Sequence, residues 1–156
     1  VYDGLMQLGA ELCIDTVDLV LSTDGDVPSQ PQQESEAHHV APKIFKETCA
    51  IDFSLSAKRI YDFVRGLSPV PGAWCMLTPR DAQAKAQVLK VYKAAKTGES
   101  SNGVEVGTLK AENRRLLVAT VDEWLELVEL QPAGKKRMAA RDYLNGFQHP
   151  EDFLLK

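Results

Sequence analysis

The sequence predicts a mainly β domain of the α+β class, in which a small antiparallel barrel carries one packed helix and follows an isolated helix and a linker. Two observations predict this fold. The apolar pattern changes from helical to strand spacing at residues 69–72, and four or five short apolar runs separated by turn residues follow over 73–130. Short strands at this spacing, with helices only at the ends, are typical of a closed or nearly closed barrel.

The first element is predicted to be a helix over residues 3–21, because its apolar residues gather on one wide face. These residues are Leu5, Leu8, Leu12, Cys13, Ile14, Val17, Leu19 and Val20. A face of this width is expected to pack on a larger surface such as a sheet, or on another copy of the chain. Residues 23–26 end the helix, and the polar, Pro-rich stretch 27–36 predicts an extended connector.

A second, well-delimited helix is predicted over residues 55–65, with Ser54 or Ser56 as its amino-terminal cap. Its apolar residues recur at three- and four-residue spacing and give it one buried face, formed by Ile60, Phe63, Val64 and Leu67. Gly66 is expected to take the left-handed conformation that ends a helix, and the prolines and glycine of residues 69–72 prevent its continuation. This helix is expected to pack across the barrel.

The barrel strands are expected at residues 74–77, 86–94, 104–111, 116–120 and 124–130. In the second of these runs Leu89 and Val91 point to one side while Lys90 points to the other, which is typical of a half-buried strand. Residues 97–103 (TGESSNG) are predicted to form a turn. We expect Trp74 to be largely buried.

The end of the chain is predicted to contain little regular structure. Residues 139–144 are expected to form a short helix that ends at Asn145 and Gly146, and residues 148–156 are expected to form a tail.

Composition and motifs argue against several classes of function. Three cysteines with no CxxC pair favour buried thiols in a reducing, cytoplasmic compartment over disulfides or zinc. The adjacent His38 and His39 lack further ligands at helical spacing, so we expect no metal site. No apolar run approaches the ~20 residues that span a bilayer, and we find no phosphate-binding glycine loop or nucleophile motif. Asp52 precedes a helix and is expected to make a turn bond, so we assign no catalytic residue.

Charge divides the chain into two parts. Residues 1–42 hold eight acidic residues and no Lys or Arg, whereas residues 43–156 hold all 18 basic residues and the other 14 acidic ones. We therefore separate a helix (1–24) and a linker (25–42) from a barrel domain (43–156), and expect their partners to differ. The candidate phosphate contacts are Lys43, Lys46, Arg65, Lys85, Lys90, Lys93, Arg114, Arg115, Lys135, Lys136 and Arg137.

Four segments together carry a resemblance to a known family: APKIFK, IDFSLSAKRIYDFVRGLSPVPGAW, LQPAGKKRM and DYLNG, which begin at residues 41, 51, 130 and 142. In this order they resemble the carboxyl-terminal part of methionyl-tRNA formyltransferase. The opening LMQLGAEL resembles the last helix of that family's catalytic domain. The chain begins in mid-pattern, as expected of a piece of a longer protein.

The resemblance implies an oligonucleotide-binding-like (OB-like) barrel that helps the enzyme to hold its initiator methionyl-tRNA. The family's formyl donor, 10-formyltetrahydrofolate, and its catalytic Asn, His and Asp belong to the preceding catalytic domain, so no cofactor and no catalytic activity are expected in this chain alone. We expect the tRNA contacts at Lys43, Lys46, Arg65, Lys135, Lys136 and Arg137. No membrane partner is expected, and the exposed face of the first helix is expected to cause self-association.

Two alternatives stay open. The RG…VPGAW segment is also similar to the hydrolase part of 10-formyltetrahydrofolate dehydrogenase and to other folate-dependent formyltransferases. The QPAGKKRM and DYLNG segments favour the tRNA enzyme, since we expect them only there. The second alternative is a freestanding nucleic-acid-binding module.

Overall fold

A computed structural model describes residues 1–29, 31, 41–81 and 85–156 of the chain. The chain divides into two compact units, Val1–Ala41 and Pro42–Lys156, and each is described by itself. Most of the linker predicted at 27–36, and the pair His38 and His39, lie outside the described residues. Within the described part of the chain, no helix combines the length and the apolar character needed to cross a membrane.

The first unit contains helix α1 (Tyr2–Ser22), which confirms the helix predicted over 3–21. The helix ends at the Thr23 cap, after which Asp24 and Gly25 take left-handed φ values of 52° and 87°. No residue of α1 is buried, and Leu5 and Leu12 are 62% and 56% exposed. The apolar face of α1 is therefore accessible along its whole length.

The second unit begins with the 3-10 helix η1 (Glu47–Cys49), followed by the turn that precedes α2 (Ala57–Leu67). Asp52 accepts bonds from the Ser54 N–H and hydroxyl at 2.9 and 2.6 Å, the turn bond predicted for it. Ser56, one of the two predicted caps, accepts from Arg59 N at 3.4 Å. Ala57, Ile60 and Val64 form the buried face of α2.

The end of α2 differs from the prediction. Gly66 lies inside the helix and is not left-handed. The helix ends one residue later, at Leu67, because the residue before a proline is driven out of the helical region, and Ser68 is extended before Pro69. Gly72 is the residue with a left-handed φ, +85°, and its N–H donates to Leu67 O at 2.9 Å.

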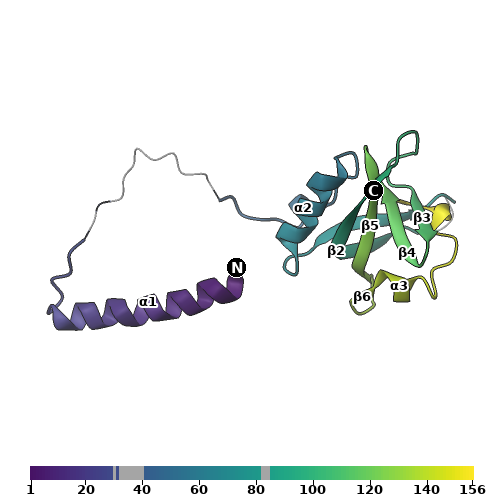
Figure 1. Ribbon diagram of the computed structural model, residues 1–156. Helices are drawn as coiled ribbons and strands as arrows, with labels where there is room; N and C mark the ends of the chain where they lie inside the picture. The colour runs from purple at the N-terminus through teal and green to yellow at the C-terminus, as the bar shows by residue number, and fades with distance from the viewer. Residues whose placement is uncertain (30, 32–40, 82–84) are drawn as a thin grey trace. The chain divides into compact units, whose positions relative to one another are not determined.

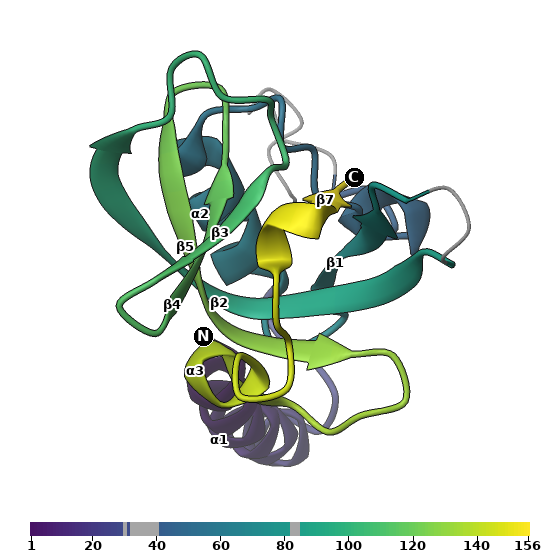
Figure 2. The same cartoon turned by 90° about the vertical axis from the view of Figure 1, so that its right-hand side faces the viewer.

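Seven strands form one antiparallel sheet in the order β3-β4-β5-β2-β1-β7, with β6 paired to β5. The strands are β1 (Ala73–Pro79), β2 (Gln87–Ser100), β3 (Leu109–Glu112), β4 (Arg115–Ala119), β5 (Glu123–Pro132), β6 (Met138–Ala139) and β7 (Phe153–Leu155). The sheet curls until β7 approaches β3, where Thr108 and Leu154 form a bridge and Leu155 N donates to Gly107 O at 2.9 Å. Figure 2 shows β7 lying between β1 and β3. The predicted nearly closed antiparallel barrel with a packed helix is confirmed; α2 packs mainly on β2 (Figure 1).

Three predicted boundaries are wrong. Residues 97–100 continue β2, because Lys96 and Ser100 pair with Leu125 and Glu123 of β5. Residues 104–107 contain a bend and a turn, and Thr108 forms only an isolated bridge, so β3 begins at Leu109. The predicted tail instead contains the 3-10 helix η2 (Pro150–Asp152) and β7, because Leu155 is 2% exposed and completes the core.

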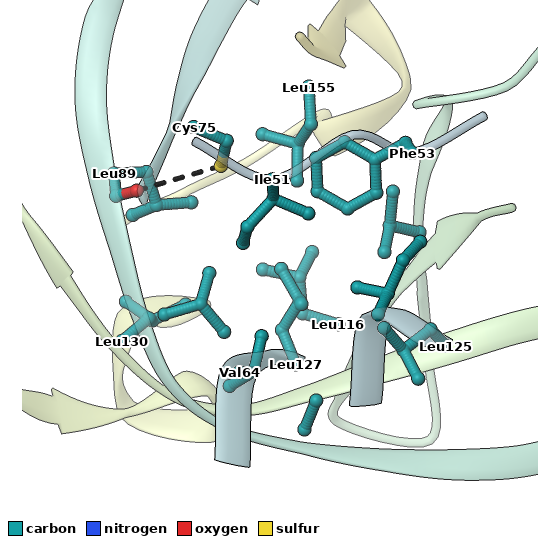
Figure 3. Packing of buried hydrophobic residues seen from close by; sticks show 14 of the residues in the cluster. Ile51, Phe53, Val64, Cys75, Leu89, Leu116, Leu125, Leu127, Leu130 and Leu155 are labelled. Carbon is teal, nitrogen blue, oxygen red and sulfur yellow. Dashed lines mark hydrogen bonds between the residues drawn. The ribbon is translucent and has the colours of Figure 1, made fainter. Parts of the chain in front are cut away.

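The core fills the inside of the barrel. Figure 3 shows Ile51, Val64, Leu89, Leu116, Leu127, Leu130 and Leu155 converging there from the turn before α2, from α2 and from the strands. Trp74 departs from the prediction: it is half-buried, because its neighbours Ala73 and Cys75 point into the core and its own side chain points outward. The predicted short helix is α3 (Ala140–Tyr143), which packs against β4, β5 and β6.

Candidate nucleic-acid interface

The outer face of β1, β2 and β5 brings polar and aromatic side chains into one row. The strand register places Trp74 opposite Lys90, and Lys90 opposite Gln131. The flanking residues Ala73, Val91 and Leu130 are in register with one another and are buried in the core. Because side chains alternate between the two faces of a strand, Trp74, Lys90 and Gln131 lie on the outside of the barrel. All three are half-buried.

Tyr92 and Arg137 extend this row. The Tyr92 hydroxyl donates to Gln131 Oε1 at 2.9 Å, and Gln131 Nε2 donates to Lys135 O at 2.8 Å. The guanidinium carbon of Arg137 lies 4.3 Å from the centre of the Tyr92 ring, within the range of a cation–π contact. We call the set Lys46, Trp74, Lys90, Tyr92, Gln131 and Arg137 the basic aromatic face.

Lys46 joins the face through Trp74. The indole Nε1–H of Trp74 donates to Lys46 O at 2.8 Å, and Lys46 Nζ lies 5.8 Å from the indole ring. Lys43, three residues earlier, lies with its Nζ 5.4 Å from the Phe45 ring. Of the two lysines that the sequence predicts at the entrance to the barrel domain, Lys46 is therefore the one held on the sheet.

Arg65 lies beside a groove between α2 and β2. The groove has a volume of about 340 Å³ and is lined by Tyr61, Arg65, Tyr92 and Lys93 among others. Arg65 pairs with Asp62 at 3.3 Å while 70% of its side chain stays exposed. Tyr92 belongs both to the lining of this groove and to the basic aromatic face, so Arg65 lies near that face.

The three predicted cations of the turn after β5 are not equivalent. Arg137 donates from Nε and Nη2 to the two carboxylate oxygens of Glu129 at 2.5 and 2.7 Å. This hydrogen-bonded guanidinium lowers the pKa of the Glu129 carboxyl. Lys135 and Lys136 are exposed, and their ammonium groups make no ion pair or hydrogen bond within the described residues. Arg137 is thus a fixed, partly neutralised cation, and the two lysines carry the unbalanced charge.

Sequence reasoning did not place Trp74 and Tyr92 at the interface. The available signal was the alternation in β2, where Lys90 and Tyr92 flank the inward Val91. The same alternation in β1 puts Trp74 outside between Ala73 and Cys75. The hydrogen bond between Tyr92 and Gln131 and the stacking of Arg137 could not be read from spacing, since they join residues about 40 positions apart.

A different arrangement neutralises the cations over β3 and β4. Arg115 pairs with Glu99 at 3.2 Å and with Glu126 at 3.8 Å, and Lys110 pairs with Glu112 at 3.1 Å. Lys110 Nζ also lies 4.3 Å from the Trp124 ring, and Trp124 closes a small apolar cluster with Leu117 and Ala119. These cations cover apolar surface and balance acids, so we do not assign them to the interface.

The described residues contain no group of three or more His, Cys, Asp or Glu side chains that could hold a metal ion. Cys49 and Cys75 are buried, as the sequence predicts for structural thiols, and burial raises the pKa of the Cys75 thiol. Cys13 differs, because it lies exposed on α1.

The fold and its outer surface define a small antiparallel β-barrel domain with a basic aromatic face. The chain belongs to the family Formyl transferase, C-terminal domain, which it matches over residues 43–148. It is 45% identical over 160 residues to a methionyl-tRNA formyltransferase of Parabacteroides distasonis, covering 99% of this chain and 48% of that protein. It is 40% identical to one of Bacteroides fragilis (100% and 48% covered) and 33% identical to one of Flavobacterium johnsoniae (97% and 46% covered).

The chain therefore spans about half the length of the curated relatives it matches. The resemblance drawn from the four sequence segments is confirmed. The match to the family, over residues 43–148, includes three of them whole and the fourth except for its first two residues.

Proposed function

We propose that this chain is the tRNA-binding part of a methionyl-tRNA formyltransferase, and that its basic aromatic face contacts initiator methionyl-tRNA. The observation that carries the proposal is the row Trp74, Lys90 and Gln131, extended by Lys46 on one side and by Tyr92 and Arg137 on the other. Lysines beside aromatic rings suit a polyanion whose bases can stack, which is the chemistry of RNA. The names of the relatives support the same substrate.

The contribution of this domain would be positional. Lys46, Lys90, Lys135 and Lys136 would neutralise phosphates, as would Lys43 and Arg65 at the two margins. The acceptor end of the tRNA would then be held over an active site elsewhere in the protein. Holding reactants in place lowers the barrier through geometry, without a reacting group from this domain.

The remaining parts of the proposal concern the rest of the enzyme. We infer that α1 packs on an amino-terminal catalytic domain, that this domain binds 10-formyltetrahydrofolate and carries the catalytic residues, and that residues 1–156 are inactive in formyl transfer. The whole protein would act in the cytoplasm, in translation initiation. The exposed apolar face of α1 supports the first of these inferences.

Replacing Lys46 and Lys90 by Gln tests the proposal. Each lost phosphate contact should reduce the steepness of the plot of log affinity against log salt by roughly 0.7–0.9. In the double variant, the slope should therefore be smaller in magnitude by about 1.4–1.8. The loss should be equal for different tRNA sequences, because phosphates carry no base identity. Affinity for tRNA is measured by fluorescence polarisation at several salt concentrations.

The matched control is Lys58→Gln with Arg59→Gln, which removes two exposed cations from the first turn of α2. The control should keep the wild-type slope. An unchanged slope in the Lys46/Lys90 variant would overturn the assignment of the face. Absence of salt-dependent tRNA binding by the unaltered chain would favour the alternative of a small-molecule formyltransferase or hydrolase.

A further inference from the structure

A pocket next to the basic aromatic face combines aromatic rings with lysines. It has a volume of about 200 Å³ and is lined by Lys85, Gln87, Lys135, Tyr143, Phe147 and Phe153, among others. This volume is below the range of about 300–1,000 Å³ typical of pockets for drug-sized ligands. We call it the aromatic pocket.

Three rings form one wall of the pocket. The Tyr143 and Phe147 rings are stacked, with centroids 4.7 Å apart and an angle of 21° between their planes. The Phe147 and Phe153 rings are tilted by 50° at 5.0 Å. All three side chains are half-buried against the core, so each holds a fixed position and still reaches the surface. A preformed aromatic wall of this kind stacks on a flat ring.

Two lysines lie at the same pocket. Lys85 and Lys135 are both exposed, and neither ammonium group makes a hydrogen bond or an ion pair within the described residues. The backbone of Lys135 is fixed, because its N–H donates to Pro132 O at 3.1 Å and its carbonyl accepts from Gln131 Nε2 at 2.8 Å. The pocket thus offers positive charge next to a flat apolar wall.

The pocket adjoins the basic aromatic face at Lys135, which lines the pocket and whose carbonyl accepts from Gln131 Nε2 of the face. Gln87 begins β2 on the side that Leu89 faces, opposite to Lys90, so the pocket and the face lie on the two sides of this strand. The rings of Phe147 and Phe153 line the same pocket as Lys135. One RNA strand that follows the face would therefore reach the pocket.

We propose that the aromatic pocket takes one unpaired nucleotide of the bound RNA, with its base against the Phe147 and Phe153 rings and its phosphate between Lys85 and Lys135. The inference rests on the proposed function, since it assumes that RNA lies on the basic aromatic face. It adds a preference for an unpaired base, because the face of a base inside a duplex is covered by its neighbours in the stack.

The first test follows the rings by NMR in the full chain. A short single-stranded RNA should shift the ring resonances of Tyr143 and Phe147 upfield, and a strand of equal length without bases should leave them in place. Phe153→Leu, which keeps apolar bulk and removes the ring, should weaken binding of the single strand about tenfold. Phe63→Leu, which removes a partly buried ring of α2, should not weaken it.

The outcomes separate the two proposals. If RNA shifts the Trp74 indole resonance but leaves the ring resonances of Tyr143 and Phe147 unchanged, the proposal for the pocket is overturned and the proposed function stays intact. If neither shifts and the chain does not bind tRNA, the proposed function fails and the pocket fails with it. If a free mononucleotide bound the pocket with the same affinity as the single-stranded RNA, the assignment of the pocket to RNA would be overturned. Lys85→Gln with Lys135→Gln should flatten the salt dependence for the single strand.

Discussion

At the scale of single residues, Asp122 makes the connection between the barrel and α2. Its Oδ1 accepts from the backbone N–H of Ala57, the first residue of α2, at 2.9 Å. The same oxygen lies 2.9 Å from the Thr120 hydroxyl and 2.9 Å from Glu123 N. These bonds, with the one from Ala57 contributing most, lower the pKa of the Asp122 carboxyl. A residue 65 positions away thus supplies a cap to α2 alongside Ser56.

We expect Asp122→Ala to lower the free energy of unfolding by about 1 kcal/mol near neutral pH, the usual effect of losing a cap. Because the folded-state pKa is lowered, the contribution of Asp122 is complete above the ordinary Asp value of about 4 and disappears as the pH falls through the lowered one. The difference between wild type and variant, measured by urea unfolding, should therefore close in acid.

Asp52→Ala is the matched control for this prediction. Asp52 also has a lowered pKa, but within the described residues its carboxylate bonds go only to Ser54, two residues later in the same turn. Its removal should cost less than that of Asp122. A difference between wild type and Asp122→Ala that persists unchanged at low pH would show that the carboxylate charge does not stabilise the barrel.

At the scale of elements, the closing strand β7 depends on one glycine. Gly107 has a φ of +85°, donates its N–H to Ala119 O and accepts from Leu155 N, both at 2.9 Å. A Cβ on Gly107 would lie 2.2 Å from Leu155 O, a backbone atom of β7. Only glycine allows the turn before β3 and the carboxyl-terminal strand to approach so closely.

Gly107→Ala should therefore destabilise the barrel by roughly 3 kcal/mol or more, from the left-handed conformation together with the clash. Gly98→Ala is the matched control, because Gly98 has a φ of +72° and no atom within 4 Å of an added Cβ. Gly98→Ala should lower the free energy of unfolding by only about 1–2 kcal/mol. Urea unfolding of both variants measures the difference, and equal losses would mean that the clash with β7 is relieved without cost.

The sequence predicted those elements whose signal is local. The helix α2 follows from its cap and its apolar spacing. Strand β4 follows from an uninterrupted apolar run, and β5 from an apolar run interrupted only by Glu126 and Glu129. The errors arose where tertiary contacts override local propensity. Residues 97–100 are turn formers that remain in β2 because Lys96 and Ser100, on either side of an irregularity, pair with β5. Residues 153–155 form a strand because they pair with the edge of β1.

The candidate site was predictable in part, for the same reason. Clusters of Lys and Arg identify cations directly, and Lys46 and Lys135 do lie on or beside the basic aromatic face. The pairing of Arg137 with Glu129, and the neighbourhood of Trp74, Lys90 and Gln131, depend on strand register. Strand register brings together residues from three distant segments, so a short sequence pattern does not predict which residues become neighbours.

At the scale of the whole molecule, the two units differ in both charge and burial. The first unit contains eight acidic residues and no Lys or Arg, and its α1 has no buried residue. The second unit holds all the basic residues and a core of its own. An exposed apolar face of several hundred Å² marks an interaction site or an aggregation hazard. We therefore expect the barrel to fold alone and α1 to pack on a partner.

Deleting residues 1–41 should leave the melting temperature of the barrel nearly unchanged and reduce self-association of the chain. The reason is that none of the described residues of the first unit belongs to the barrel core, while the exposed Leu5, Leu8 and Leu12 lie in that unit. Calorimetry measures the first effect and sedimentation velocity the second. Leu5→Gln with Leu12→Gln in the full chain provides the control, because it should reduce association without shortening the chain. A barrel that loses stability on deletion would place α1 in its core, and association that persists in both variants would locate the contact on the barrel itself.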